Sequence, residues 1–205
     1  MASMKNFRPI ESLAVVSSGS SLSAARHDVR AVKVGDLDGS GTLPAQLSEA
    51  GAPKSGLKAR LEEGDVVLSV RGTTNYAAPV TAAALEPGPL FATLDVASIR
   101  LHPESGLLPA YLAALLNQNT IQNYLAAFRT GAAAPRLPLE PIRNLEVSLP
   151  PVEQQRTLLR LIEMKNREDA LHRQLGDSRA NLINQLLCHP TKEGPATEVR
   201  SVQAT

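Results

Sequence analysis

The polar residues best suited to binding a nucleic acid follow an apolar run at residues 66–70. This loop combines a guanidinium group, a flexible glycine, two hydroxyls, an amide and a phenol. Arginine can donate two hydrogen bonds to guanine, asparagine can pair with adenine in the same way, and hydroxyl groups suit phosphates. The candidate DNA contacts in this loop are Arg71, Thr73, Thr74, Asn75 and Tyr76.

Further cations lie beside two other turn segments. Arg129 and Arg136 flank a run of small residues, and Lys54 and Lys58 lie near Arg60 in a small basic group. Guanidinium and ammonium groups at such positions could contact the phosphate backbone. The alternative, that all of these side chains are solvated loop ends, remains open at this point.

The residue types needed for a metal site occur without the required spacing. Residues 36–41 imitate the first half of a calcium loop, but position 12 is Leu47, where that loop requires a glutamate. The four histidines show no metal-ligand spacing, and Cys188 is the single cysteine. We therefore expect no metal and no cofactor.

No motif in the sequence indicates an enzyme. Ser69, His102 and Asp95 are the residue types of a hydrolytic triad, but no nucleophile-elbow sequence surrounds any serine. A phosphate-binding loop and the glycine pattern of a dinucleotide site are both missing. We expect a non-catalytic protein.

Composition restricts the class of protein further. The chain has 205 residues, of which 43% are hydrophobic and 20% charged, which suits one packed domain with an appendage. It contains no apolar run that could span a bilayer and no signal peptide, and its lone cysteine favours a reducing, cytoplasmic location. The net charge of +1 gives no support to a nucleic-acid binder, which usually has a basic excess.

The periodicity of residues 1–150 predicts a globular α+β domain. Alternating or β-branched runs bounded by turn residues indicate short strands, and apolar residues at helical spacing indicate one helix at 108–128. The strands are predicted at 13–16, 29–34, 66–70, 79–85, 97–101 and 145–149.

A long helix is predicted after Pro150 and Pro151. Proline is tolerated at the start of a helix, and no proline or turn cluster follows until about residue 187. The apolar stripe of this helix is narrow, as in a coiled coil, with polar residues in two of its core positions. Its apolar members are Leu161, Met164, Leu171, Leu175, Leu182 and Leu186. Residues 189–205 are polar and are predicted to be a disordered tail.

Five segments follow one another in an order found in one protein family. One segment has Gly64 and Asp65 before the apolar run at 66–70. Another has the Pro150–Pro151 pair, which Gln154 and Gln155 follow closely. The segments are 13–19, 32–37, 61–73, 131–137 and 149–156. In these segments the chain resembles a specificity (S) subunit of a type I restriction–modification system, in a half-length form with a single target-recognition domain.

The resemblance implies a function and a set of partners. Such a subunit is non-catalytic and directs a methyltransferase (M) subunit, and through it a restriction (R) subunit, to a bipartite site in double-stranded DNA. The resemblance also divides this chain into two parts. Residues 1–150 would be a target-recognition domain, and residues 151–188 a helix for dimerisation, spacing and methyltransferase docking. Because the usual family member has two domains and two antiparallel helices, we expect two copies of this chain to pair as a homodimer through an antiparallel coiled coil.

A second interpretation belongs to another class of protein. The helix could drive interaction with a protein, or compete with an intact specificity subunit, without direct DNA readout. A neighbouring methyltransferase gene would favour the first interpretation, and an isolated gene would favour the second.

Overall fold

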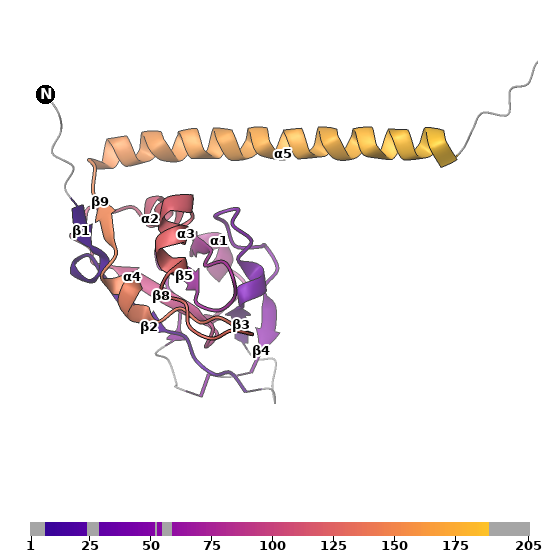
Figure 1. Ribbon diagram of the computed structural model, residues 1–205. Coiled ribbons are helices and arrows are strands. Elements are labelled where there is room, and N and C mark those ends of the chain that lie inside the picture. The colour runs from indigo at the N-terminus through magenta and orange to yellow at the C-terminus, as the bar shows by residue number, and fades with distance from the viewer. Residues whose placement is uncertain (1–6, 24–28, 52, 55–58, 189–205) are drawn as a thin grey trace, which may run out of the picture. The chain divides into compact units, whose positions relative to one another are not determined.

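The structure is a computed structural model that describes residues 7–23, 29–51, 53–54 and 59–188. The chain divides into two compact units, Met1–Glu163 and Met164–Thr205. The first unit mixes sheets and short helices, and the described part of the second is helical (Figure 1). The predicted α+β class with a long C-terminal helix is therefore confirmed. The predicted tail at 189–205 lies outside the described residues.

Nine short strands form three sheets in the described part of the first unit. A four-stranded antiparallel sheet has the order β2-β8-β5-β6, a three-stranded sheet has the order β4-β3-β7, and β1 pairs with β9. Strand β3 runs parallel to β7 and antiparallel to β4. The strands are β1 Phe7–Pro9, β2 Ala14–Ser18, β3 Val29–Val32, β4 Ser48–Ala50, β5 Val66–Ser69, β6 Ala77–Pro79, β7 Leu90–Ala92, β8 Val96–Leu101 and β9 Glu146–Ser148.

The helices lie mostly in the second half of the chain. Their bounds are η1 Ile10–Ser12, η2 Val34–Asp36, α1 Ala82–Leu85, α2 Pro109–Leu116, α3 Asn119–Ala126, α4 Leu139–Arg143 and α5 Val152–Cys188. The prediction of one helix at 108–128 was wrong, because the chain forms α2 and α3 there. Asn117 ends α2 and turns its amide to β6, accepting from the backbone N–H of Ala77 (2.8 Å) and donating to its carbonyl (2.9 Å).

The strand predicted at 79–85 is also wrong over most of its length. Strand β6 ends at Pro79, which has no N–H to donate to a ladder. Thr81 then caps α1 by accepting a hydrogen bond from the N–H of Ala84, and alanine favours a helix. Strands β1, β4 and β7 were not predicted, since each has three residues and too little periodicity to detect.

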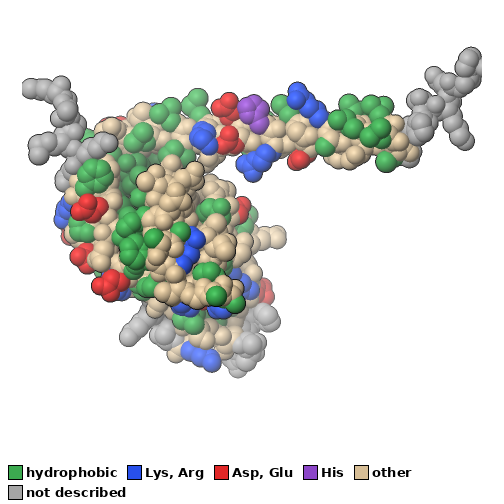
Figure 2. All heavy atoms as spheres, in the orientation of Figure 1, with side chains coloured by type: hydrophobic (Ala, Val, Ile, Leu, Met, Phe, Trp, Pro, Cys, Tyr) green, Lys and Arg blue, Asp and Glu red, His purple; other side chains and the backbone are tan. Residues whose placement is uncertain are grey.

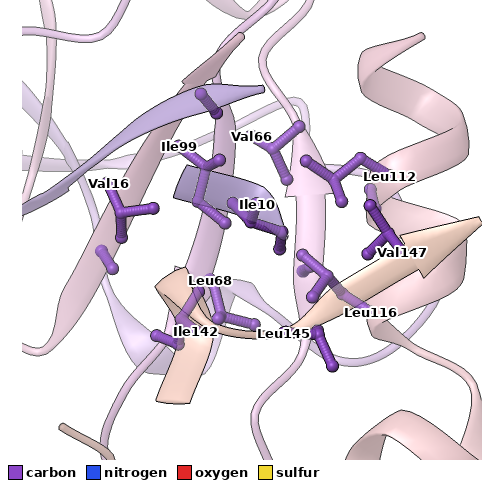
Figure 3. Close-up of a cluster of buried hydrophobic side chains, with 14 of the residues drawn as sticks. Ile10, Val16, Val66, Leu68, Ile99, Leu112, Leu116, Ile142, Leu145 and Val147 are labelled. Carbon is purple, nitrogen blue, oxygen red and sulfur yellow. The ribbon is translucent and has the colours of Figure 1, made fainter. Parts of the chain in front are cut away.

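The core lies on both sides of β5, which explains why its sequence is apolar without alternation. Val66 and Leu68 face a cluster with the α2 and α4 side chains, and Val67 faces a second cluster with Leu90 and Val96. Figure 3 shows the first cluster, in which labelled side chains from distant parts of the chain point toward one another. These are Ile10, Val16, Val66, Leu68, Ile99, Leu112, Leu116, Ile142, Leu145 and Val147.

The first turn of α5 is anchored in the first unit by a buried glutamine. Gln155 is fully buried, and its Oε1 accepts from the N–H of Leu108 at 2.8 Å. Its Nε2 donates to the carbonyls of Gly106 and Pro150, both at 2.8 Å. One side chain therefore satisfies three backbone groups, and this is the structural role of the glutamine in the Pro-Pro segment.

The rest of α5 carries an exposed apolar stripe. All six predicted stripe residues, from Leu161 to Leu186, lie on this helix with at least half of each side chain exposed. Ile183 and Leu187 widen the stripe near the C-terminal end of α5, where apolar side chains gather in Figure 2. No helix in the described part of the chain is long and apolar enough to cross a membrane.

Candidate nucleic-acid interface

The loop after β5 and the turn before α4 form one surface, although some sixty residues separate them. The N–H of Leu137 donates to the carbonyl of Val70 at 2.8 Å, and the N–H of Gly72 donates to the carbonyl of Pro135 at 2.9 Å. Arg71 and Arg136 are thereby opposed in an antiparallel bridge. The backbone brings two of the predicted DNA contacts together.

A tight hairpin presents the second of these arginines. Thr130 and Arg136 exchange two backbone hydrogen bonds, of 2.8 and 2.9 Å. Gly131 starts the turn between them with φ +94°, a conformation that an L side chain rarely adopts. The glycine in this small-residue segment is therefore required by the turn.

A single carboxylate lies between the two arginines. Asp95 Oδ1 accepts from Arg136 Nη1 at 3.0 Å, and Asp95 Oδ2 accepts from Arg71 Nη1 at 3.4 Å. Arg136 Nη2 also donates to the carbonyl of Leu94 at 2.9 Å. We call Arg71, Asp95 and Arg136 the arginine cluster. Two guanidinium groups share one carboxylate, so the cluster keeps an excess positive charge.

The cluster is accessible to a ligand. The side chains of Arg71 and Arg136 are 51% and 43% exposed, against 29% for Asp95. Ion pairs at such exposure contribute only about 0–1 kcal/mol, and about half of each arginine side chain remains open to a ligand. Thr73 and Thr74, which follow Arg71, are also exposed.

Asn75 and Arg129 belong to the same two segments as Arg71 and Arg136 but are engaged in internal hydrogen bonds. Asn75 is fully buried, its Nδ2 donates to the carbonyl of Ser69 (2.8 Å), and its Oδ1 accepts from Arg129 Nε (2.8 Å). The Asn75 backbone also binds the amide of Gln122 in both directions. In this conformation, the Asn75 amide has no free edge to offer a base.

The remaining candidates lie in other environments. Tyr76 is half-buried against the second core cluster, and its ring leaves no room for a side chain at Gly39. Lys54 is exposed in another segment, where its N–H donates to the carbonyl of Ser21 at 2.9 Å. Lys58 lies outside the described residues. Among the candidates that the structure describes, those near β5 and the hairpin converge.

The acidic residues of the motif segments stabilise turns. The Asp65 side chain is buried and accepts from Arg100 Nε and Nη2, at 2.8 and 2.7 Å, and from the N–H of Glu62 at 2.8 Å. The hydrogen bond to Asp65 raises the pKa of Arg100 above its ordinary value. Asp36 accepts from the N–H of Lys33 at 2.7 Å. The described residues contain no group of three His, Cys, Asp or Glu side chains that could hold a metal ion.

Sequence reasoning missed two residues that organise this part of the molecule. The sequence offers Asp95 only as a residue type of a hydrolytic triad, whereas its carboxylate pairs with arginines. It offers Gln155 only as a motif residue, whereas the side chain binds three backbone groups. The one signal for Asp95 was its position as a lone acid in a short turn between apolar runs.

Solved structures with this fold come from type I restriction–modification systems. One is a chain from a structure concerning complex assembly and conformational transition of such a system, with a TM-score of 0.62 and 15% identity. The match covers 87% of this chain and 43% of the solved chain. The HsdS subunit from Thermoanaerobacter tengcongensis has a TM-score of 0.56 and 15% identity, with coverages of 83% and 39%. The S subunit from M. genitalium has a TM-score of 0.54 and 13% identity, with coverages of 88% and 44%.

These similarities establish the fold, which is that of type I restriction–modification S subunits. The chain spans less than half the length of each of the three solved chains. No protein-family model matches the sequence, and no curated protein matches it.

Proposed function

We propose that this chain is a non-catalytic DNA-specificity subunit of a type I restriction–modification system. The single observation that carries the proposal is the exposed arginine cluster, Arg71 and Arg136 on Asp95, on a domain with the S-subunit fold. Exposed guanidinium groups on a rigid backbone are suited to reading base edges and holding phosphates. In this proposal, residues 1–150 recognise the target.

The proposal assigns the catalytic steps to partners. The chain directs a methyltransferase subunit, and through it a restriction subunit, to the site in double-stranded DNA, in the cytoplasm. Its balanced charge fits this assignment, because a methyltransferase that also encloses the duplex can supply part of the phosphate contacts.

Two observations support pairing of two copies. The chain spans 39–44% of the solved chains, so two copies approach their length. The exposed stripe on α5 is an apolar surface that water disfavours and that a second helix could cover. An antiparallel coiled coil of residues 151–188 would relate the two domains by a dyad. Identical domains so related read a palindromic bipartite site.

Selection from a duplex library with a randomised central region tests this function. The full chain, with and without its methyltransferase, is expected to enrich one motif with two identical, inverted half-sites. Enrichment of no motif under either condition would refute DNA readout. It would leave the coiled-coil interaction module, or competitor of an intact specificity subunit, as the better account.

A further inference from the structure

The turn that carries Asp95 is fixed by its neighbours. Thr93 donates to the carbonyl of Val32 through its N–H (3.1 Å) and its hydroxyl (2.9 Å), and the N–H of Val96 donates to the carbonyl of Thr93 (2.9 Å). The Asp95 carbonyl accepts from the N–H of Val70 at 2.9 Å. A side chain at Gly19 would overlap the carbonyl of Thr93, so this neighbour also packs closely. The carboxylate therefore sits on a fixed backbone.

The two arginines bind this carboxylate unequally. Arg136 has a shorter contact with Asp95, 3.0 Å, and a second bond to the Leu94 carbonyl, so both of its terminal nitrogens are held. Arg71 has one contact of 3.4 Å and the more exposed side chain. The guanidinium group of Arg71 therefore has donors left for a ligand, whereas Arg136 is the more firmly oriented of the two.

We propose, on the basis of the DNA-reading function above, that Asp95 is a positioning residue that directs Arg71 to a guanine edge and disfavours a phosphate. The ligand class is a neutral base edge with two acceptors, the O6 and N7 atoms of guanine. Asp95 itself need not touch the base, because it acts through the guanidinium group that it orients.

Charge explains the preference for a base. A phosphate bound between Arg71 and Arg136 would lie beside the Asp95 carboxylate and be repelled by it, whereas a guanine edge carries no net charge. Orientation adds to the preference. A guanidinium group already held by one nitrogen loses less conformational freedom when the other donors bind. Asp95 thus lowers affinity for DNA of any sequence and raises discrimination at one base pair.

Two measurements on the full chain with its methyltransferase test this inference. The first is selection from a duplex library, and the second is the affinity for a duplex of unrelated sequence at fixed salt. The wild-type complex is expected to enrich a G·C pair in each half-site. In Asp95→Asn, the guanine preference at that pair should fall about tenfold or more, and the unrelated duplex should bind more tightly. Glu86→Gln is the matched control, because it removes an exposed carboxylate at the end of α1, outside the three segments that form the arginine cluster.

Asp95→Glu distinguishes the effect of the position of the carboxylate from the effect of its charge. It also provides a test if Asp95→Asn does not fold. It keeps the negative charge, so affinity for the unrelated duplex should stay at the wild-type value, while the longer side chain should weaken the guanine preference. The inference is overturned if both variants retain the wild-type motif, or if the motif lacks a G·C pair. A wild-type complex that enriches no motif at all would instead refute the proposed function itself.

Discussion

Arg129 donates a hydrogen bond from Nε to Oδ1 of Asn75 at 2.8 Å, and Asn75 is fully buried. The bond joins the end of the loop after β5 to the start of the hairpin. Two residues that the sequence suggested as DNA contacts are thus bound to each other. The bond therefore helps to hold together the two segments that carry Arg71 and Arg136.

Substitution of Asn75 by alanine should reduce stability before it affects recognition. It would leave the Ser69 carbonyl and the Arg129 side chain without a partner, which we expect to lower the free energy of unfolding by about 2–3 kcal/mol. Urea unfolding of the full chain measures the change. The exposed neighbour Thr74 provides the control, and Thr74→Ala should change stability by less than about 0.5 kcal/mol. Equal stability of the two variants would contradict the supporting role of Asn75.

The buried Gln155 leads to a second prediction about stability. Gln155→Ala removes three hydrogen bonds to backbone groups of Leu108, Gly106 and Pro150, and should cost about 2–4 kcal/mol. The adjacent Gln154 is exposed, so Gln154→Ala should be close to wild type. Thermal unfolding of both variants distinguishes them, and a Gln155→Ala melting temperature equal to that of Gln154→Ala would show that the glutamine does not anchor α5.

The exposed Arg71 leads to a prediction about binding. Arg71→Ala should weaken binding to the selected duplex by about tenfold or more, because one base contact is lost, while thermal stability should remain near wild type. Arg8→Ala removes an exposed arginine on β1 and is the control for charge alone. Fluorescence anisotropy gives both dissociation constants, and equal values for the two variants would remove Arg71 from the interface.

The apolar stripe leads to a prediction about oligomeric state. Leu171→Glu should convert a homodimer to a monomer, since a charge would be buried between the helices. Asn166 is exposed and, on a helix with about 3.6 residues per turn, lies on the side away from Leu161, Met164 and Leu171, so Asn166→Glu should leave the dimer intact. Light scattering over a range of concentrations measures both masses. A wild-type chain that is monomeric at high concentration would argue against self-pairing.

The sequence predicted the elements whose signals are local. The apolar, β-branched run at 66–70 and the proline-started helix from Val152 were recognised because their turns, caps and periodicity lie within the segment itself. The helix predicted at 108–128 was wrong because Asn117 ends α2 through a bond to β6, a distant strand. Tertiary contacts of this kind leave no local pattern.

The candidate site shows the same division. Arg71, Thr73 and Thr74 follow a strong strand and were recognisable as exposed polar residues. Asn75 is bonded to the distant Arg129, and Arg71 lies opposite Arg136 beside a backbone bond between Val70 and Leu137. The bridging carboxylate of Asp95 comes from a third segment. None of these contacts is encoded in residue spacing.

The most direct measurement of the central claim is genome-wide sequencing of modified bases, in cells that carry this chain and in cells from which its gene has been deleted. A DNA-specificity subunit that pairs with itself predicts one palindromic, bipartite motif that is modified only when the chain is present. Restoring the gene should restore that motif, and restoring it with Arg71→Ala should reduce its modification. Identical sets of modified motifs with and without the gene would contradict the account.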